Sequence, residues 1–448
     1  MTDTLDHLTQ SLLQRAAKAG ADAADVLAVR GSATSIDVRN GVLEQAERSE
    51  STDIGLRVFV GQRVANVSSS DVRDASLAIM AERAVAMARE APEDPYVGLA
   101  DPSQLADVRD GRDLELYDAT DEPTPAELET DARSAESAAL AVNGITQVSS
   151  ASAGYGWQDI HLAASNGFSG GYRRTSRHTS CVAIAGTGTG MERDHDADQR
   201  IFQGDLRTPQ EIGRTAAERA LERMAPRKPK TGAYPVLFDE RISSSLIGHL
   251  LAAINGVSIA RRSSWALDLL GQDVLPSGLS LTENPHRMRV AGSRPFDAEG
   301  LATQSRDIVK DGILTGWTLD LATARKLELA PTANAARSTS GGPSPSVSNV
   351  ALTQGAHSRD DLIAQMGTGL VVTSMIGSTI NPNTGDYSRG AAGFWVENGT
   401  VAYPVSGVTI AGNLRDMLRR ITPANDARKW LSRVVPSVLV EGLTLAGE

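Results

Sequence analysis

One short string in this sequence matches a motif of nucleophilic catalysis. Residues 167–171 read Gly-Phe-Ser-Gly-Gly, which fits the GxSxG pattern that exposes a strained serine for attack on a carbonyl carbon. The motif requires a strand before the serine and a helix after it, whereas residues 172–175 are typical of a strand. We therefore interpret Ser169 as part of a hairpin turn. The alternative, a hydrolase that uses Ser169, predicts labelling by a fluorophosphonate probe.

Two further segments imitate ligand-binding loops. Residues 194–198 read Asp-His-Asp-Ala-Asp and, with Asp205, have the acidic spacing of a calcium loop, but Gln199 stands where that loop needs glycine. We expect a solvated loop tip at this segment. Residues 186–190 alternate glycine and threonine, yet they lack the lysine and the following helix that a phosphate-binding loop requires.

His249 lies in a predicted helix at residues 243–254. A zinc peptidase needs two imidazoles about one helical turn apart and a glutamate beside the first. This helix has one histidine and no glutamate. Since a lone imidazole cannot offset the cost of stripping water from the ion, we interpret His249 as a helix-face or interface residue.

Composition excludes several classes of protein. The net charge of −11 over 448 residues argues against a nucleic-acid binder, which needs a basic surface. The single cysteine, Cys181, allows neither an intrachain disulfide nor a site of several thiolates. The N-terminal residues lack a signal-peptide pattern and no run of eighteen apolar residues occurs. We therefore expect a soluble, cytoplasmic protein that binds neither nucleic acid nor membrane.

The first half of the chain predicts two units of similar order. Apolar residues at helical spacing predict a helix that ends at Gly20, and turn residues such as Asn40-Gly41 separate antiparallel strands. Ser69 or Ser70 is expected to cap a second helix. The order of helix, strands and helix then recurs, which suggests a structural duplication. We expect an N-terminal α+β domain at 1–95, a linker at 96–123 and a middle α+β domain at 124–228.

Residues 232–448 predict a larger C-terminal α+β domain. Its expected elements include a buried strand at 234–238, a helix at 359–366 and several strands joined by short turns. Strands paired through short turns favour a mostly antiparallel sheet over a parallel, doubly wound one. The predicted fold class is therefore α+β, with several domains.

The last third of the chain contains a conspicuous stretch at residues 384–414. A polar, glycine-rich turn leads into a strand, an Asn398-Gly399 hairpin and a second strand. Asp386 and Arg389 are spaced for an ion pair across a tight turn. The glycines either close the core of the sheet or leave room for an extended peptide to pair with a sheet edge. The sequence leaves both interpretations open.

This stretch is similar to the C-terminal signature of the PmbA, or TldE, branch of the TldD/PmbA family. The family comprises bacterial subunits of a metallopeptidase that cuts small or unfolded peptides. The resemblance covers nearly the whole chain and is densest after about residue 230. Further matching segments, in the same order, are 248–250, 261–264, 295–300, 307–314 and 366–372.

The resemblance implies where zinc is bound. In the catalytic TldD branch, a His-Glu-x-x-x-His helix lies between a strand and a loop with two basic residues, here Arg261 and Arg262. That branch also draws a cysteine ligand from the segment that here spans 431–437 and has no thiol. We therefore expect no catalytic residue and no metal ligand in this chain, with His249 at the degenerate zinc-helix position.

The predicted function is that of a non-catalytic PmbA/TldE-like subunit. The resemblance implies a heterodimer with a TldD-like, zinc-bearing partner, which encloses the zinc and its glutamate base in a cavity open to unfolded peptides, as in peptide maturation and antitoxin degradation. The alternative is a stand-alone homodimer that binds peptides or modulates gyrase without peptidase activity. The candidate contacts to substrate or partner are Arg261, Arg262, Asp386, Tyr387, Ser388 and Arg389.

Overall fold

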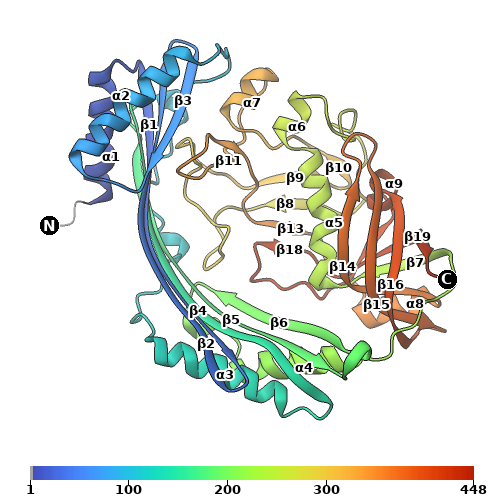
Figure 1. Cartoon of the computed structure of the whole chain (residues 1–448). Coiled ribbons are helices and arrows are strands. Elements are labelled where there is room, and N and C mark those ends of the chain that lie inside the picture. Colours follow the sequence, from blue (N-terminus) through green and yellow to red (C-terminus); the bar gives the residue numbers. More distant parts are fainter. Residues whose placement is uncertain (1–3) are drawn as a thin grey trace.

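The computed structural model describes residues 4–448 and confirms the predicted mixed α+β fold. A long, curved N-terminal sheet partly surrounds the C-terminal half of the chain (Figure 1). The strand order is β3-β2-β1-β4-β5-β6, and every neighbouring pair in it is antiparallel. Its strands are β1 (Ala23–Arg39), β2 (Val42–Val60), β3 (Arg63–Ser69), β4 (Ile145–Ala164), β5 (Ser169–Ala185) and β6 (Glu192–Arg200).

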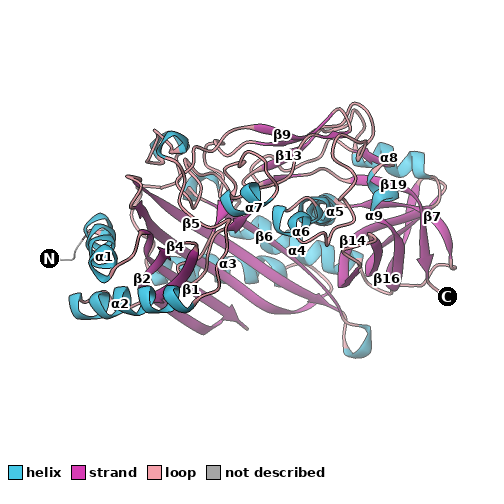
Figure 2. Cartoon of the chain, turned by 90° about the horizontal axis from the view of Figure 1, so that it is seen from above, coloured by secondary structure: helices cyan, strands magenta, loops and turns pink. Residues whose placement is uncertain are grey.

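Four helices cover the outer face of this sheet (Figure 1 and Figure 2). Leu12 and Leu77 pack against Val26 and Leu56 at one end of the sheet, while Ala135 and Ile212 pack against Cys181 at the other. The helices are α1 (Leu5–Ala19), α2 (Asp74–Glu90), α3 (Pro125–Leu140) and α4 (Pro209–Glu222). The order of helix, three strands and helix thus occurs twice, as the sequence predicted.

The two units share one sheet, because β1 pairs with β4 from Asp25 opposite Ala164 to Val38 opposite Ala151. The Asn40-Gly41 hairpin has φ values of 54° and 68° at its two central residues, which is the conformation that this dipeptide favours. The expected cap of α2 was wrong. That helix begins at Asp74 after Arg73, whose side chain makes no capping bond, and Ser69 instead accepts a hydrogen bond from the backbone N–H of Asp71.

The C-terminal half contains a second six-stranded sheet, of order β16-β15-β14-β7-β19-β17, and a smaller sheet, of order β10-β9-β8-β13-β18. Among the described strands, only β7 with β14 and β13 with β18 pair in parallel, so the predicted mostly antiparallel sheet is confirmed. The large sheet comprises β7 (Gly232–Phe238), β14 (Gly369–Ile380), β15 (Asp386–Glu397), β16 (Thr400–Asn413), β17 (Ile421–Pro423) and β19 (Val438–Ala446). The smaller elements are β8 (Leu281–Glu283), β9 (Arg306–Lys310), β10 (Ile313–Leu314), β11 (Ala335–Ala336), β12 (Ser344–Pro345), β13 (Val350–Leu352) and β18 (Arg433–Val434).

Helix α5 (Glu240–Ala253) packs against the large sheet and forms the centre of the C-terminal core. Its apolar residues Leu246, Ile247 and Leu250 are buried with Phe238 of β7. Asp239 accepts a hydrogen bond from Arg241 N and so begins the helix three residues before the predicted start. The other helices are α6 (Gly256–Ala260), α7 (Leu321–Lys326), α8 (Arg359–Met366) and α9 (Leu414–Leu418).

A buried ion cluster joins the N-terminal sheet to the C-terminal half. Asp25 of β1 accepts hydrogen bonds from Arg57 of β2, at 2.9 Å from Nε, and from Arg337 at 2.5 Å. Glu299 lies 3.7 Å from Arg57 and accepts a hydrogen bond from Leu321 N. Burial raises the pKa of Glu299 to about 8, whereas Arg337 and Arg57 outweigh burial and lower the pKa of Asp25.

The segment expected to be a linker contacts both halves. Ala106 N donates to Gly300 O, Thr175 N donates to Leu116 O, and Arg325 of α7 donates to the carbonyl oxygens of Tyr96, Gly98 and Leu99. The division into domains at 95, 123 and 228 stays a prediction. Across residues 4–448, the helices are all too short or too polar to cross a membrane.

Candidate functional site

The predicted zinc-helix position meets the signature strand in space. His249 lies on α5, and its ring packs edge-to-face against Tyr387 of β15, with centroids 5.8 Å apart. Tyr387 is 2% exposed, and its hydroxyl donates to Met375 Sδ of β14 at 3.2 Å. Burial raises the pKa of Tyr387 to about 12. Tyr387 is therefore uncharged at neutral pH and packs against the imidazole ring of His249.

Arg389 supplies positive charge to the same place. Its Nε donates to Gly377 O at 2.7 Å. Burial, together with the charge of Arg389, lowers the pKa of His249 to about 4. Within residues 4–448, the Nε2 atom of His249 is buried and has no hydrogen-bond partner. His249 is therefore a neutral imidazole at physiological pH.

The C-terminal segment 431–437 packs along α5. Ser243 Oγ donates to Val435 O at 3.3 Å, and Ser437 Oγ accepts a hydrogen bond from Glu240 N at 3.0 Å. A Cβ atom built on Gly248 would lie 3.2 Å from a guanidinium nitrogen of Arg433. Thus the segment in which the catalytic branch has a cysteine does reach the histidine helix, but here it presents an arginine.

These residues do not fit a zinc ion. Zinc needs three or four nitrogen, sulfur or oxygen donors, and the described part of the chain has no group of three His, Cys, Asp or Glu side chains that could hold a metal. His249 offers one donor atom, and the charge of Arg389 beside it repels another cation. The absence of catalytic and metal residues, as predicted from the sequence, stays a prediction.

The protonation of His249 is testable by NMR. We expect its ring protons to titrate with a midpoint of about 4 in the folded protein. Because the charge of Arg389 disfavours the imidazolium, Arg389→Gln should raise that midpoint, whereas Arg389→Lys, which keeps the charge, should leave it nearly unchanged. A wild-type midpoint of about 6.5, the value of an ordinary histidine, would contradict this description.

The four signature residues divide between two faces of β15. Tyr387 and Arg389 share the face beside His249, while Asp386 and Ser388 point to the other face, because strand side chains alternate. The predicted ion pair of Asp386 with Arg389 is therefore wrong. Asp386 instead accepts hydrogen bonds from Thr384 Oγ1 at 2.6 Å and Asn413 Nδ2 at 3.1 Å, and these bonds lower its pKa. Ser388 is half-buried between Thr379 and Ala411.

Arg261 and Arg262 lie at the end of α6, away from this cluster. Both side chains are exposed, and Arg262 has a φ of 56°, a left-handed conformation that is uncommon for arginine. Arg261 lines a separate cavity of about 300 Å³ with Asp94 and Lys326. The structure thus does not bring these two arginines to His249.

A larger cavity adjoins the His249 cluster, and sequence reasoning missed it. Its volume is about 870 Å³, and it lies between β6, at residues 192–195, and β14, at residues 373–376. Ile242 of α5 and Met375, the partner of the Tyr387 hydroxyl, also line it. No short sequence motif predicts this cavity, because the residues that line it come from segments far apart in the chain.

The acidic segment 194–198 is part of β6, so the predicted solvated loop tip is wrong. Alternation turns Asp194, Asp196 and Asp198 to one buried face. Arginines neutralise each of them there. The shortest pairs are Arg223 with Asp194 at 3.3 Å, Arg207 with Asp196 at 2.7 Å and Arg200 with Asp198 at 3.0 Å.

Ser169 is the first residue of β5 and follows the Asn166-Gly167 turn, as predicted. Its Oγ lies 3.4 Å from His161 Nε2 and 3.3 Å from Asp6 Oδ1. A strand follows it, so the strand-to-helix turn that strains a catalytic serine is not formed. This geometry supports the hairpin interpretation.

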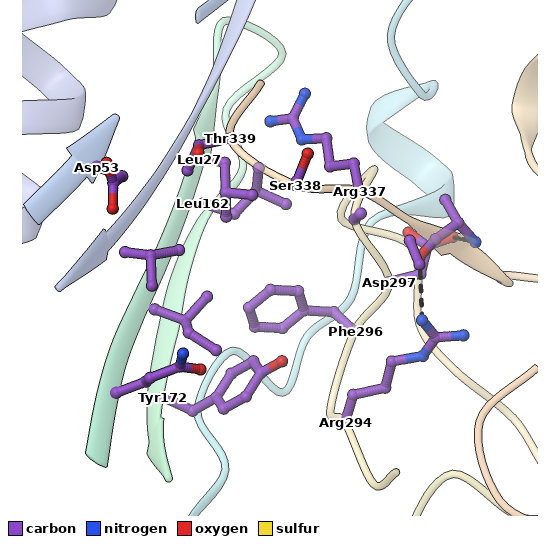
Figure 3. A pocket seen from close by; sticks show the side chains of 16 residues that line it. Leu27, Asp53, Leu162, Tyr172, Arg294, Phe296, Asp297, Arg337, Ser338 and Thr339 are labelled. Carbon is purple, nitrogen blue, oxygen red and sulfur yellow. Dashed lines mark hydrogen bonds between the residues drawn. The ribbon is translucent and has the colours of Figure 1, made fainter. Parts of the chain in front are cut away.

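Another cavity, of about 380 Å³, lies between the N-terminal sheet and the loops that hold Phe296 and Arg337. Figure 3 shows Leu27 and Leu162 on the strand side and Phe296 directed toward them from the loop side. Phe296 packs edge-to-face against Tyr172, with centroids 5.6 Å apart. This cavity contains none of the predicted site residues.

Comparison with known families gives a consistent assignment for the whole chain. Residues 24–88 match the PmbA/TldA metallopeptidase domain 1, residues 118–224 match the central domain, and residues 231–447 match the C-terminal domain. These three matches span most of the chain.

Individual relatives agree. Metalloprotease PmbA of Escherichia coli is 38% identical over 95% of this chain and 93% of its own length, and the Metalloprotease PmbA homolog of Haemophilus influenzae is 35% identical over 97% and 94%. A crystal structure from Bacteroides thetaiotaomicron, described as a candidate modulator of DNA gyrase, superposes with a TM-score of 0.92 at 29% identity and covers 100% of both chains. The chain therefore belongs to the PmbA/TldD metallopeptidase family.

Proposed function

We propose that this chain is the non-catalytic subunit of a two-chain zinc metallopeptidase, paired with a TldD-like subunit that holds the zinc. The observation that supports this division is the set of side chains around α5. His249 is a single neutral imidazole, and the charge beside it is the cation Arg389, whereas a zinc site would need further ligands there. Zinc chemistry then belongs to the partner.

This chain would contribute part of the wall of a peptide-binding chamber. The cavity of about 870 Å³ borders the part of β14 that is paired with a strand on one side only. β14 pairs with β7 only from Leu370 to Val372, whereas its pairing with β15 continues to Ile380. In the described part of the chain, residues 373–380 thus have no strand partner on their other side. An unfolded peptide can add a strand to such an edge through main-chain hydrogen bonds.

The proposed substrates are small or unfolded peptides, because a folded protein would not enter a cavity of this size. The cellular roles that we propose are peptide maturation and degradation of unfolded proteins such as antitoxins, in the cytoplasm. Arg261 and Arg262 are exposed, and we propose that they contact the partner subunit rather than the peptide.

The experiment is to purify this chain without any partner and to measure its zinc content and its activity on an unstructured peptide. We expect less than stoichiometric zinc and no hydrolysis, because one imidazole does not hold the ion. His249→Ala should leave the zinc content unchanged. Stoichiometric zinc with EDTA-sensitive hydrolysis by the isolated chain would overturn the proposal.

A pull-down from cell extract tests the partner. Recovery of a protein of similar length that contains a His-Glu-x-x-x-His helix is expected, and peptidase activity should appear when the two chains are mixed. Recovery of gyrase without such a protein would favour the alternative of a gyrase-modulating protein, which is consistent with the name of the Bacteroides relative.

A further inference from the structure

A groove lies between the segment that follows the N-terminal unit and a loop of the C-terminal half. Its volume is about 510 Å³, and residues from 106–114 and 286–303 line it. Backbone hydrogen bonds of 2.9 Å join the two segments at both ends, from Ala106 N to Gly300 O and from Arg289 N to Leu114 O. No described residue lines both this groove and the cavity of about 870 Å³ between β6 and β14. The groove, which we call the acidic groove, is therefore a separate surface.

Apolar side chains form the floor of the acidic groove. Leu114 and Pro295 are buried there. Val108 and Met288 also line the groove, and each is 58% exposed. Large apolar side chains that are exposed together in one hollow mark a place where a ligand packs. Methionine adapts its shape to different partners, so the floor suits ligands of varied outline.

Three carboxylates give the acidic groove its charge. Asp107, Asp110 and Asp113 line it, and none of the described residues that line it is a lysine or an arginine. Asp110 pairs with Arg112 at 3.3 Å, and both of these side chains are more than half exposed. The carboxylates of Asp107 and Asp113 make no hydrogen bond or ion pair within residues 4–448. Two acids are therefore available to a ligand beside an apolar surface.

His286 adds a further acceptor to the groove. Its Nε2 lies 3.0 Å from Thr303 Oγ1, and the Thr303 hydroxyl donates its proton to the carbonyl oxygens of Arg294, at 2.9 Å, and Pro295, at 3.1 Å. Thr303 Oγ1 therefore accepts from the protonated Nε2, which leaves Nδ1 of His286 as an acceptor. Burial lowers the pKa of His286, so the ring is neutral at physiological pH. A matching ligand must donate hydrogen bonds.

The chemistry of the groove selects an organic cation rather than a metal ion. In the described part of the chain, no three His, Cys, Asp or Glu side chains converge closely enough to hold a metal. Arginine and lysine combine what the groove asks for, because each has an apolar stem and a charged end that donates hydrogen bonds. The stem can pack on Val108 and Met288 while the charged end pairs with Asp107 or Asp113.

We propose that the acidic groove binds an unfolded peptide segment in which arginine or lysine lies next to large apolar residues. The choice of a peptide rests on the proposed function, which this inference deepens by naming a class of substrate and a contact outside the cavity beside β14. Pairing of a peptide with a sheet edge through its main chain depends little on its side chains. The acidic groove would therefore supply the preference for basic, apolar segments.

Methionine-methyl NMR of the isolated chain tests this inference. Met288 lines the acidic groove and Met375 lines the cavity beside β14, so each methyl signal reports on one site, and Met288→Leu and Met375→Leu assign them. The probe is an unstructured peptide with Leu-Arg-Leu between glycine and serine residues. It should shift the Met288 signal. The same peptide with glutamate in place of arginine should bind about tenfold more weakly at this site.

A matched pair of variants tests the role of the carboxylates. Asp113→Asn should weaken binding of the arginine peptide about fivefold, as measured by the Met288 signal. Asp121→Asn removes the same charge from an exposed side chain that does not line the groove, and it should leave binding unchanged. Because both positions are exposed, both variants should keep the wild-type thermal unfolding midpoint.

An unmoved Met288 signal, or equal binding of the arginine and glutamate peptides, would overturn the inference. Equal effects of Asp113→Asn and Asp121→Asn would do the same. The failure of the proposed function is seen separately, because zinc content and hydrolysis are measured without this peptide. A shift of Met288 without any shift of Met375 supports the acidic groove and counts against strand addition to β14.

Discussion

Replacing Asp25 by asparagine should lower the free energy of unfolding by about 3 to 5 kcal/mol. Asp25 is 2% exposed and accepts hydrogen bonds from both Arg57 and Arg337. Without its carboxylate, two guanidinium groups remain buried, and the nearest ion-pair partner left is Glu299, at 3.7 Å from Arg57. A buried charge that has lost its partner is costly because neither water nor a counterion solvates it.

Urea denaturation monitored by tryptophan fluorescence would measure this effect. The matched control is Glu44→Gln, which breaks the pair of Glu44 with Arg39 at 3.4 Å, where both side chains are about half exposed. That exposed pair should contribute less than about 1 kcal/mol. Equal effects of the two substitutions would show that the Asp25 cluster does not hold the two halves of the chain together.

Glu299→Gln should have the opposite effect and stabilise the protein at pH 8. Burial raises the pKa of Glu299 from 4.5 to about 8, so the folded protein keeps a proton that the unfolded chain releases above its lower pKa. The contribution of Glu299 is therefore fully present below pH 4.5 and is lost as the pH rises to about 8. Glutamine is neutral at every pH and can still accept the hydrogen bond from Leu321 N. We expect a gain of about 2 to 4 kcal/mol at pH 8.

The free energy of unfolding, measured from pH 5 to pH 8, tests whether Glu299→Gln stabilises the protein. The difference between the variant and the wild type should be small at pH 5 and grow with pH. Glu283→Gln is the control, because Glu283 is equally buried but accepts hydrogen bonds from Arg306 Nε at 2.8 Å and Asn334 Nδ2 at 2.8 Å. That substitution should destabilise the protein. A Glu299→Gln variant less stable than wild type at pH 8 would mean that Glu299 is ionised in the folded state.

Several features were predicted correctly because they depend on residues close together in the sequence. The Asn40-Gly41 hairpin formed because these two residues accept positive φ values. Helix α8 occupies the predicted residues 359–366, since Ser358 caps it and bonds reciprocally with Asp361. The helix with a single histidine was also evident from residue types alone, and so was the lack of a thiol in 431–437.

Contacts between residues that are distant in the sequence were decided by the tertiary structure alone. Whether Arg389 pairs with Asp386 or lies beside His249 depends on which face of β15 each occupies, and that in turn depends on where the strand begins. The acids of β6 became buried because α4 and neighbouring segments bring arginines to that face. The cavity between β6 and β14, like the Asp25 cluster, joins segments distant in the chain. Residue type and spacing determine short-range geometry, whereas contacts at long sequence separation follow from how whole sheets pack.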